Sequence, residues 1–228
     1  QYTRTALTQQ GFIYAGIDLS TLPLHHLVNH TKGTLLSNTP RISIIVGSAR
    51  PVRIGRQLAD SVATVLGDST DAEIQILDLA EIALPMLDEP LMAGMNLYQN
   101  AHTIAWAKQI ADSDAVVFLT PQYNAGYPAA LKNAIDYIYA EWKGRPSAII
   151  SYGGHGGLAS AAQLRQVLEF IGNDLIDTDV SFVIKQTDYT QEWALADDDE
   201  VVARTADEVR ALGTALLAKG EAREAGAA

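Results

Sequence analysis

The sequence contains no cysteine among its 228 residues. This absence excludes disulfides, thiolate metal sites and every mechanism that needs a cysteine nucleophile. A chain without disulfides fits a reducing compartment, and we expect a cytoplasmic protein. Uninterrupted apolar runs are also short, and none approaches the roughly 18 residues that a membrane span requires. We therefore expect neither a disulfide-stabilised fold nor a membrane protein.

Positive charge is scarce as well. The chain has 16 Lys and Arg residues against 27 Asp and Glu residues, which gives a formal net charge of −11. An acidic chain of this kind repels a phosphate backbone, so nucleic-acid binding is not expected. Any site for a small anion must then be built locally by a cluster of basic residues. The length and the hydrophobic content of 48% fit one globular α/β domain with extensions.

The first 40 residues differ in composition from the rest. They contain one acidic residue, Asp18, several Ser and Thr, and few basic residues. No secretory signal pattern is visible, and the shortage of basic residues argues against a transit peptide. We interpret residues 1–40 as an N-terminal extension of unknown role, 41–220 as the folded domain and 221–228 as a C-terminal tail. No metal site is expected, because His25, His26 and His30 lack an accompanying HExxH glutamate.

Short apolar runs alternate with helical patterns from residue 41 onward. Five repeats of strand and helix predict βαβ units, a parallel sheet and helices on both of its faces. Five strands favour the flavodoxin-like order 2-1-3-4-5, in which a ligand binds beyond the carboxyl ends of strands 1 and 3. The predicted strands are 42–46, 73–77, 115–119, 147–151 and 180–184, and the predicted helices are 52–66, 97–111, 128–142, 157–172 and 197–219.

The loop after the first predicted strand is basic. It begins with Gly47 and Ser48 and carries Arg50, Arg53 and Arg56, three positive charges in seven residues. It leads into a helix, whose first N–H groups and dipole attract phosphate, and the planar guanidinium suits phosphate oxygens. The loop therefore predicts a phosphate site, although a solvated basic helix start would give the same pattern. No Gly-Lys-Ser/Thr is present, which excludes a Walker A loop.

Two further unusual loops follow the third and fourth predicted strands. Residues 120–128 combine two prolines with Tyr123, Asn124 and Tyr127, which suits a planar heterocycle but also an ordinary Pro-rich turn. Residues 153–157 place four glycines around His155, so backbone N–H groups can approach a ligand closely. The G-x-G-x-x-A match that starts at residue 154 is a weak sign of direct NAD binding, because it follows the fourth strand. His155 is a candidate proton donor, a stacking wall or an ordinary loop residue.

Taken in order, these loops resemble the NADPH-dependent FMN reductase family over roughly residues 41–185. The resemblance implies an FMN-dependent oxidoreductase that takes hydride from NADPH or NADH. It would pass electrons to free flavin, quinones or similar acceptors by ping-pong transfer through flavin N5, as a homodimer or homotetramer. The matching pieces are Gly47-Ser48-Ala49-Arg50, Pro121-Gln122-Tyr123-Asn124, Leu131-Lys132-Asn133-Ala134-Ile135-Asp136 and Tyr152-Gly153-Gly154-His155-Gly156-Gly157.

The resemblance also assigns residues to FMN. Many members of the family carry Ser and Asn where this chain has Arg53 and Gly55, which leaves the geometry of the phosphate contacts open. The backbone of Gly153 and Gly154 would approach the pyrimidine side of the ring. The resemblance implies a phosphate site of Ser48, Arg50, Arg53, Ile54 and Gly55, a ribityl and ring site of Pro121, Gln122, Tyr123 and Asn124, and a further set of Tyr152, Gly153, Gly154 and His155.

The predicted helix 128–142 carries apolar residues on more than one side. This width favours an oligomer, unless the extra side packs under the loop at 84–96. Two other functions stay open at this stage, a flavodoxin-like electron carrier and a redox-sensing flavin-binding interaction module. Oxidation of reduced nicotinamide by the purified protein would distinguish a reductase from both. The apolar residues concerned are Ile135, Tyr137, Ile138, Tyr139 and Trp142.

Overall fold

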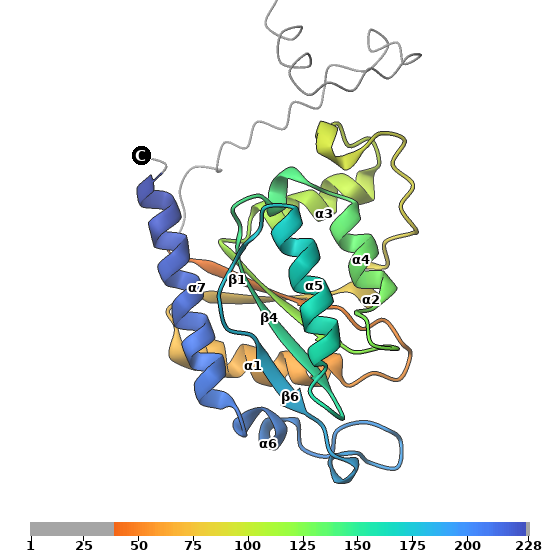
Figure 1. Ribbon diagram of the computed structural model, residues 1–228, viewed down its shortest axis with the longest axis vertical. Coiled ribbons are helices and arrows are strands. Elements are labelled where there is room, and N and C mark those ends of the chain that lie inside the picture. The colour runs from red at the N-terminus through yellow and green to blue at the C-terminus, as the bar shows by residue number, and fades with distance from the viewer. Residues whose placement is uncertain (1–38, 227–228) are drawn as a thin grey trace, which may run out of the picture.

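The computed structural model describes residues 39–226, which form a parallel sheet flanked by helices (Figure 1). The strand order is β2-β1-β3-β4-β5, with β6 also paired to β4, and every pairing is parallel. The predicted flavodoxin-like fold is thereby confirmed. The strands are β1 (Arg41–Val46), β2 (Glu73–Asp78), β3 (Ala115–Pro121), β4 (Pro146–Gly153), β5 (Asp174–Leu175) and β6 (Val180–Val183).

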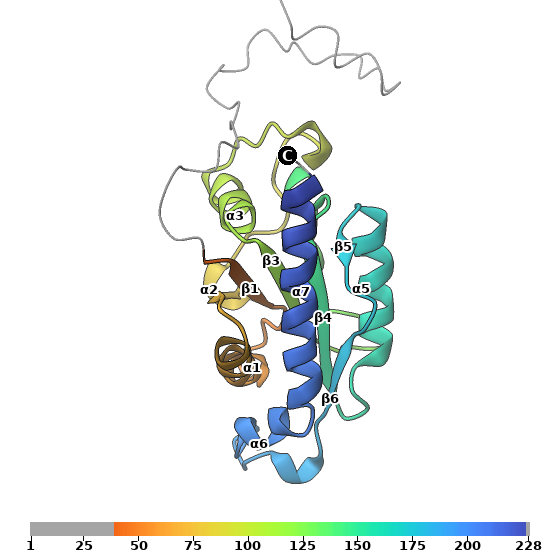
Figure 2. The ribbon, with the colours of Figure 1, turned by 90° about the vertical axis from the view of Figure 1, so that its left-hand side faces the viewer.

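The helices cover both faces of the sheet. One face packs against α1, α6 and α7 and the other against α3, α4 and α5, because neighbouring side chains of each strand point to opposite faces. Thus Ile44 of β1 lies in the first core and Ile45 in the second. The long helix α7 runs beside the sheet in Figures 1 and 2. The helices are α1 (Gly55–Ser69), α2 (Leu79–Ile82), α3 (Ala101–Ala111), α4 (Ala129–Asp136), α5 (Leu158–Phe170), α6 (Asp198–Ala203) and α7 (Ala206–Gly226).

The structure corrects several predicted boundaries. The predicted fifth strand, 180–184, is observed as β6, and the short strand β5 that precedes it was not predicted. Between the two, Arg165 of α5 donates to the Ile176 carbonyl and pairs with Asp179. The last helix is divided, into α6 and α7, and continues to Gly226 instead of ending near residue 219. Asp197 caps the start of α6, since it accepts a hydrogen bond from the Glu200 N–H at 2.8 Å. Among the described residues no helix is long and apolar enough to cross a membrane.

The helix predicted over 128–142 ends at Asp136, and this changes the argument for an oligomer. The side chains of Ile135, Tyr137, Ile138 and Trp142 are all buried in the second core, and only Tyr139 is exposed. The alternative, packing under the loop at 84–96, is the one that the structure shows. The wide apolar surface therefore gives no support to an oligomer, which now depends on the family resemblance.

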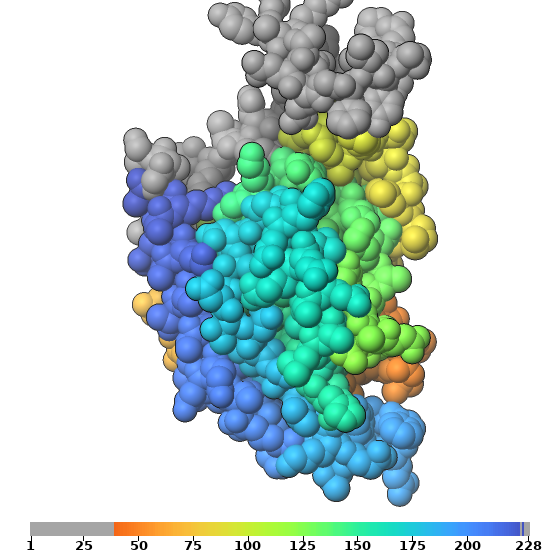
Figure 3. Space-filling view, in the orientation of Figure 1, coloured from red at the N-terminus to blue at the C-terminus, as the bar shows by residue number. Residues whose placement is uncertain are grey.

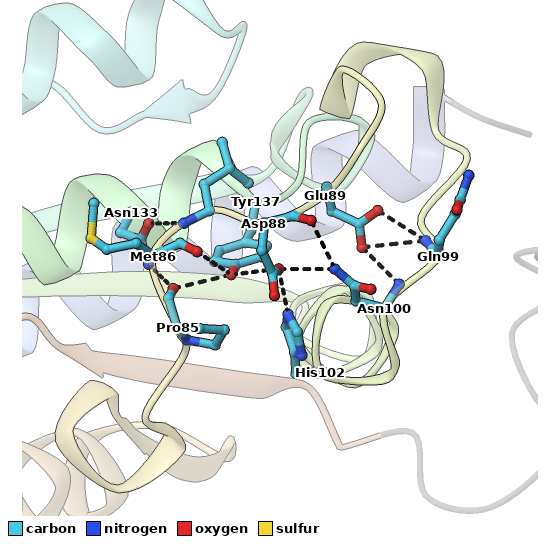
Figure 4. A network of polar contacts seen from close by, with 10 residues as sticks. Pro85, Met86, Asp88, Glu89, Gln99, Asn100, His102, Asn133 and Tyr137 are labelled. Carbon is cyan, nitrogen blue, oxygen red and sulfur yellow. Dashed lines mark hydrogen bonds and ion pairs between the residues drawn. The ribbon is translucent and has the colours of Figure 1, made fainter. Parts of the chain in front are cut away.

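A polar network fixes the loop at 84–96 onto α3 and α4 (Figure 4). At its centre Asp88 Oδ1 accepts the Tyr137 hydroxyl at 3.0 Å and the Asn100 amide at 2.9 Å, and lies 2.9 Å from His102 Nε2. The amide of Asn133 donates to the Pro85 carbonyl at 2.7 Å and its carbonyl accepts from the backbone. Burial, followed by the Asp88 contact, raises the pKa of Tyr137 to about 12. This region is structural and lies on the α3–α4 side of the sheet.

Candidate functional site

The buried end of the candidate site is formed by Ser48, which follows β1, and Gly55, the first residue of α1. The Ser48 Oγ atom is fully buried and has no hydrogen-bond partner among the described residues. The Tyr152 hydroxyl lies beside Ser48 Oγ, and burial raises the pKa of Tyr152 while the nearby Ser48 lowers it. The two hydroxyl groups do not reach hydrogen-bonding geometry. A Cβ atom on residue 55 would lie 2.3 Å from Ser48 Oγ and 2.5 Å from the Tyr152 hydroxyl. Glycine is thus required here, and an unpaired buried hydroxyl faces the start of a helix.

The three arginines of the first loop have different environments. Arg50 is exposed, makes no ion pair with any described residue, and lies over the Tyr123 ring at 5.9 Å. Arg53 pairs with Asp78, a buried carboxylate at the end of β2, at 2.5 Å, while its Nε atom is buried and unpaired. Arg56 pairs with Asp60 and Glu81 on the surface. Arg50 is therefore the cation with most capacity for a ligand, and Arg56 the one with least.

For two of the predicted phosphate residues, Ile54 and Arg53, only some of the polar groups are available to a ligand. The side chain of Ile54 is buried in the first core, so only its backbone can face a ligand. Arg53 is already neutralised by Asp78, a partner that the sequence analysis did not foresee. Asp78 also accepts from the Ala80 N–H at 3.0 Å and so caps α2. One carboxylate thus connects the end of β2 with the basic loop.

The second loop forms a tight reverse turn after β3. Tyr123 and Gly126 are joined by two backbone hydrogen bonds of 2.8 and 3.0 Å, and Asn124 and Ala125 between them both have positive φ, 49° and 65°. Positive φ at both central positions is typical of a type I′ turn, which asparagine favours. Gln122 accepts from the Ala159 N–H at 3.1 Å, and Pro121 accepts from Ser160 at 2.8 Å. The start of α5 therefore holds this loop in place.

The glycine loop is shaped so that its backbone stays open. Gly157 has φ of 72°, and a Cβ atom there would lie 2.8 Å from the Tyr152 carbonyl oxygen, so the turn into α5 requires glycine. Gly154 is exposed, and a Cβ atom there would meet no atom within 4 Å. His155 is exposed too, and makes no hydrogen bond to a described residue. The loop thus offers open backbone next to the end of β4.

Side chains of these loops converge on one place at the carboxyl edge of the sheet. Tyr152 interacts electrostatically with Tyr123, Tyr189 and Arg53, and Arg50 interacts with both Tyr123 and Tyr189. Burial is the largest cause that raises the pKa of each of the three tyrosines. The loops after β1, β3, β4 and β6 also meet at the lower right of Figure 3, coloured orange, green, teal and light blue.

Sequence reasoning missed three residues of this cluster. Asp78, Gln57 and Tyr189 come from the end of β2, from α1 and from the segment after β6. An acidic residue at a strand end was visible for Asp78, but its partner Arg53 is 25 residues away in the sequence. No local pattern marks Gln57 or Tyr189, since both act through contacts between distant segments.

The arrangement suits a planar ligand that carries a phosphate group. An unpaired buried hydroxyl, an unpaired guanidinium and the first turn of α1 are the donors that a phosphate requires. A tyrosine ring and an open glycine backbone lie on the other side, where a flat ring can stack and accept hydrogen bonds. The chemistry of the residues present therefore fits such a group.

Comparisons with known proteins agree with this chemistry. The sequence pattern of the family described as "NADPH-dependent FMN reductase" matches residues 40–187. The chain is 45% identical over 139 residues to an NAD(P)H-dependent FMN reductase of Schizosaccharomyces pombe, covering 60% of this chain and 70% of that protein. It is 31% identical over 146 residues to a quinone reductase of Pseudomonas putida, covering 60% and 73%.

The fold is also shared with solved structures. The flavoenzyme FerB of Paracoccus denitrificans, an NAD(P)H:(acceptor) oxidoreductase, has a TM-score of 0.59 at 23% identity. The alignment covers 80% of this chain and 98% of FerB. At this identity the likeness concerns the arrangement of strands and helices, and it agrees with the strand order described above.

Proposed function

The chain belongs to the NADPH-dependent FMN reductase family, and on that premise we propose that it binds FMN and uses it to oxidise NADPH or NADH. The observation that carries this proposal is the buried, unpaired Ser48 hydroxyl at the start of α1, with the unpaired Arg50 nearby. FMN has one phosphate and one planar ring, which corresponds to the two sides of the site. The relatives named above are reductases of FMN and of quinones, which supports a free flavin or a quinone as acceptor.

The phosphate side of the site binds and orients. In this proposal Ser48 donates its hydroxyl hydrogen to a phosphate oxygen and Arg50 donates from its guanidinium. The backbone of Ile54 and Gly55 adds the N–H groups and positive end of the α1 dipole. Arg53, whose charge is balanced by Asp78, adds its unpaired Nε donor. These contacts would set the position of the rest of the cofactor relative to the sheet edge.

The ring side would hold a flat group and leave one face open. Tyr123, under Arg50, lines this side, and the turn at Asn124 keeps the loop rigid. Gln122 has its carbonyl oxygen occupied by Ala159, so its amide N–H groups remain for the ligand. When bound, FMN supplies the hydride chemistry at its N5, which we infer proceeds in a ping-pong order.

The open glycine loop would admit the two substrates in turn. Gly153 and Gly154 offer backbone groups to the edge of the ring, and no side chain there covers its face. A hydride donor must approach to about 3–3.5 Å, which a covered ring would prevent. Tyr152 lies below this loop, and His155 stands at its rim as a candidate proton donor for the reduced acceptor. We further infer a homodimer or homotetramer and a cytoplasmic location, which light scattering and cell fractionation would test.

The test is anaerobic reduction of the flavin-loaded protein. The purified chain is reconstituted with FMN, mixed with NADPH or NADH in a stopped-flow instrument, and followed by the loss of flavin absorbance. Bleaching by either nucleotide, followed by recovery on addition of a quinone, supports the reductase. Bleaching by dithionite but by neither nucleotide rejects it in favour of an electron carrier. Absence of flavin binding rejects both.

A further inference from the structure

The segment after β6 folds back onto the phosphate side of the candidate site. We call residues 185–196 the C-terminal hairpin. Tyr189 and Leu195 pair in it as an isolated antiparallel bridge, and the match to the family ends within it, at residue 187. In Figure 1 it is the light-blue loop below the orange loop that precedes α1.

Gln57 fixes this hairpin to α1. Its side-chain carbonyl accepts from the Leu195 N–H at 3.0 Å and its amide donates to the Leu195 carbonyl at 3.1 Å. Gln57 lies in the first turn of α1, two residues after Gly55. Because Tyr189 is bridged to Leu195, the same two bonds place Tyr189 near the start of this helix.

The base of the hairpin is anchored independently. Asp188 is buried and accepts two hydrogen bonds of 2.8 Å from the Arg204 guanidinium and one of 2.8 Å from the Lys185 N–H. At the tip, Trp193 is 59% exposed and has φ of 63°, a strained conformation for a bulky residue. Its ring stands edge-on to Tyr189 with centroids 5.8 Å apart. The hairpin is therefore anchored at its base, and the Tyr189 ring contacts Trp193 at its tip.

The Tyr189 side chain lies within electrostatic range of the groups at the predicted phosphate position. It is half-buried against the first core and interacts electrostatically with Arg50 and with Tyr152, the residue beside Ser48 and Gly55. Its hydroxyl has no hydrogen-bond partner among residues 39–226, and neither has the fully buried Ser48 Oγ. The segments that carry two unpaired hydroxyls and an unpaired guanidinium thus meet near the start of α1.

We propose that Tyr189 is a further phosphate-binding residue, whose hydroxyl donates a hydrogen bond to the phosphate of FMN, and that the C-terminal hairpin forms a fourth wall of the site. The proposal rests on the FMN binding proposed above. The phosphate is the expected contact because the hairpin is joined to the first turn of α1, whereas Tyr123 and the glycine loop lie on the ring side.

The experiment compares FMN with riboflavin, which has the same ring and ribityl chain but no phosphate. Each flavin is titrated into the flavin-free full-length protein, and binding is followed by quenching of flavin fluorescence. The variant is Tyr189→Phe, which keeps the ring that packs on Trp193. The control is Tyr139→Phe, because Tyr139 is 41% exposed, its hydroxyl is likewise unpaired, and it follows α4 away from the hairpin.

We expect Tyr189→Phe to raise the Kd for FMN about tenfold, since hydrogen bonds to charged groups are of that strength, and to leave the Kd for riboflavin unchanged. Tyr139→Phe should change neither. Equal weakening of both flavins, or an unchanged Kd for FMN, would overturn the assignment. If the wild-type protein binds no FMN, the proposed function fails together with this inference. If wild type binds FMN and only Tyr189→Phe is without effect, the inference alone fails.

Discussion

Replacement of Gly55 by alanine tests whether the start of α1 is shaped for a ligand. The new Cβ atom would lie 2.3 Å from Ser48 Oγ, 2.5 Å from the Tyr152 hydroxyl and 3.2 Å from Val46 Cγ1, whereas ordinary contacts begin near 3.4 Å. Ser48 and Tyr152 are both buried, so neither can turn into solvent to relieve the overlap. One of the two hydroxyls must therefore move from its position at the helix start.

The expected loss of stability is small, because two effects oppose each other. Overpacking costs about 1–3 kcal/mol, and alanine in place of glycine in a helix returns up to about 1 kcal/mol. A net loss of roughly 0–3 kcal/mol corresponds to a fall in Tm of at most about 12 °C for a chain of this size. The affinity for FMN should fall as well. A displaced hydroxyl removes a hydrogen bond to the phosphate, which raises the Kd for FMN roughly 10- to 100-fold.

Gly67→Ala is the matched control in the same helix. There the nearest atom to the new Cβ is Ile74 Cγ1 at 4.0 Å, an ordinary contact, and residue 67 is exposed. We expect it to raise Tm slightly and to leave the Kd for FMN unchanged. Thermal unfolding of the flavin-free proteins and fluorescence titration with FMN measure the two effects separately. Wild-type affinity in Gly55→Ala, or an equal loss in Gly67→Ala, would refute the reasoning.

Three other predictions follow from single contacts. Arg50→Ala should raise the Kd for FMN roughly 10- to 100-fold and Arg56→Ala much less, because Arg56 is already paired with two carboxylates; equal effects in titration would contradict the phosphate assignment. The hydrogen bonds from Arg204 are the largest cause that lowers the pKa of Asp188, to about 2. The Asp188 carboxylate therefore stabilises the folded protein fully above about pH 4, and this stabilisation is lost as the pH falls to 2. Tm measured between pH 7 and 2 should fall in that window for wild type, and Arg204→Met should lower Tm at pH 7 and flatten the window. His155→Ala should leave FMN affinity unchanged, since His155 is exposed; a lower quinone turnover would then assign it the proton, and an unchanged one would leave this to water.

Sequence patterns predicted the sheet, which the structure confirms, and the place of the candidate site, which stays a prediction. Long apolar runs such as 115–119 belong to strands buried on both faces, and a parallel sheet brings the ends of such strands to one edge. The loops after residues 46, 119 and 151 could therefore be placed together before any contact was known. Gly157 could also be expected to matter, because its conformation is a local property of the turn into α5.

Tertiary structure decided how each side chain is used. The apolar residues of 134–142 predicted an exposed apolar face on one long helix. In the structure the helix ends at Asp136, and Tyr137 lies under the loop at 84–96. Arg53 and Arg50 look alike in sequence, yet only Arg53 meets a buried carboxylate, Asp78. These outcomes depend on which distant segment lies opposite, and that is set by packing of the whole core.

The C-terminal hairpin shows the same limit most clearly. Tyr189 and Trp193 follow the last strand without any local motif, and Gln57 reads as one polar residue of an amphipathic helix. Only the fold brings Gln57 to Leu195, 138 residues further along the chain, and so Tyr189 to the start of α1. Periodicity and turn residues are determined within a few positions of the chain, so sequence alone could place the phosphate loop. A wall contributed by a distant segment depends on long-range contacts, which the tertiary structure alone supplies.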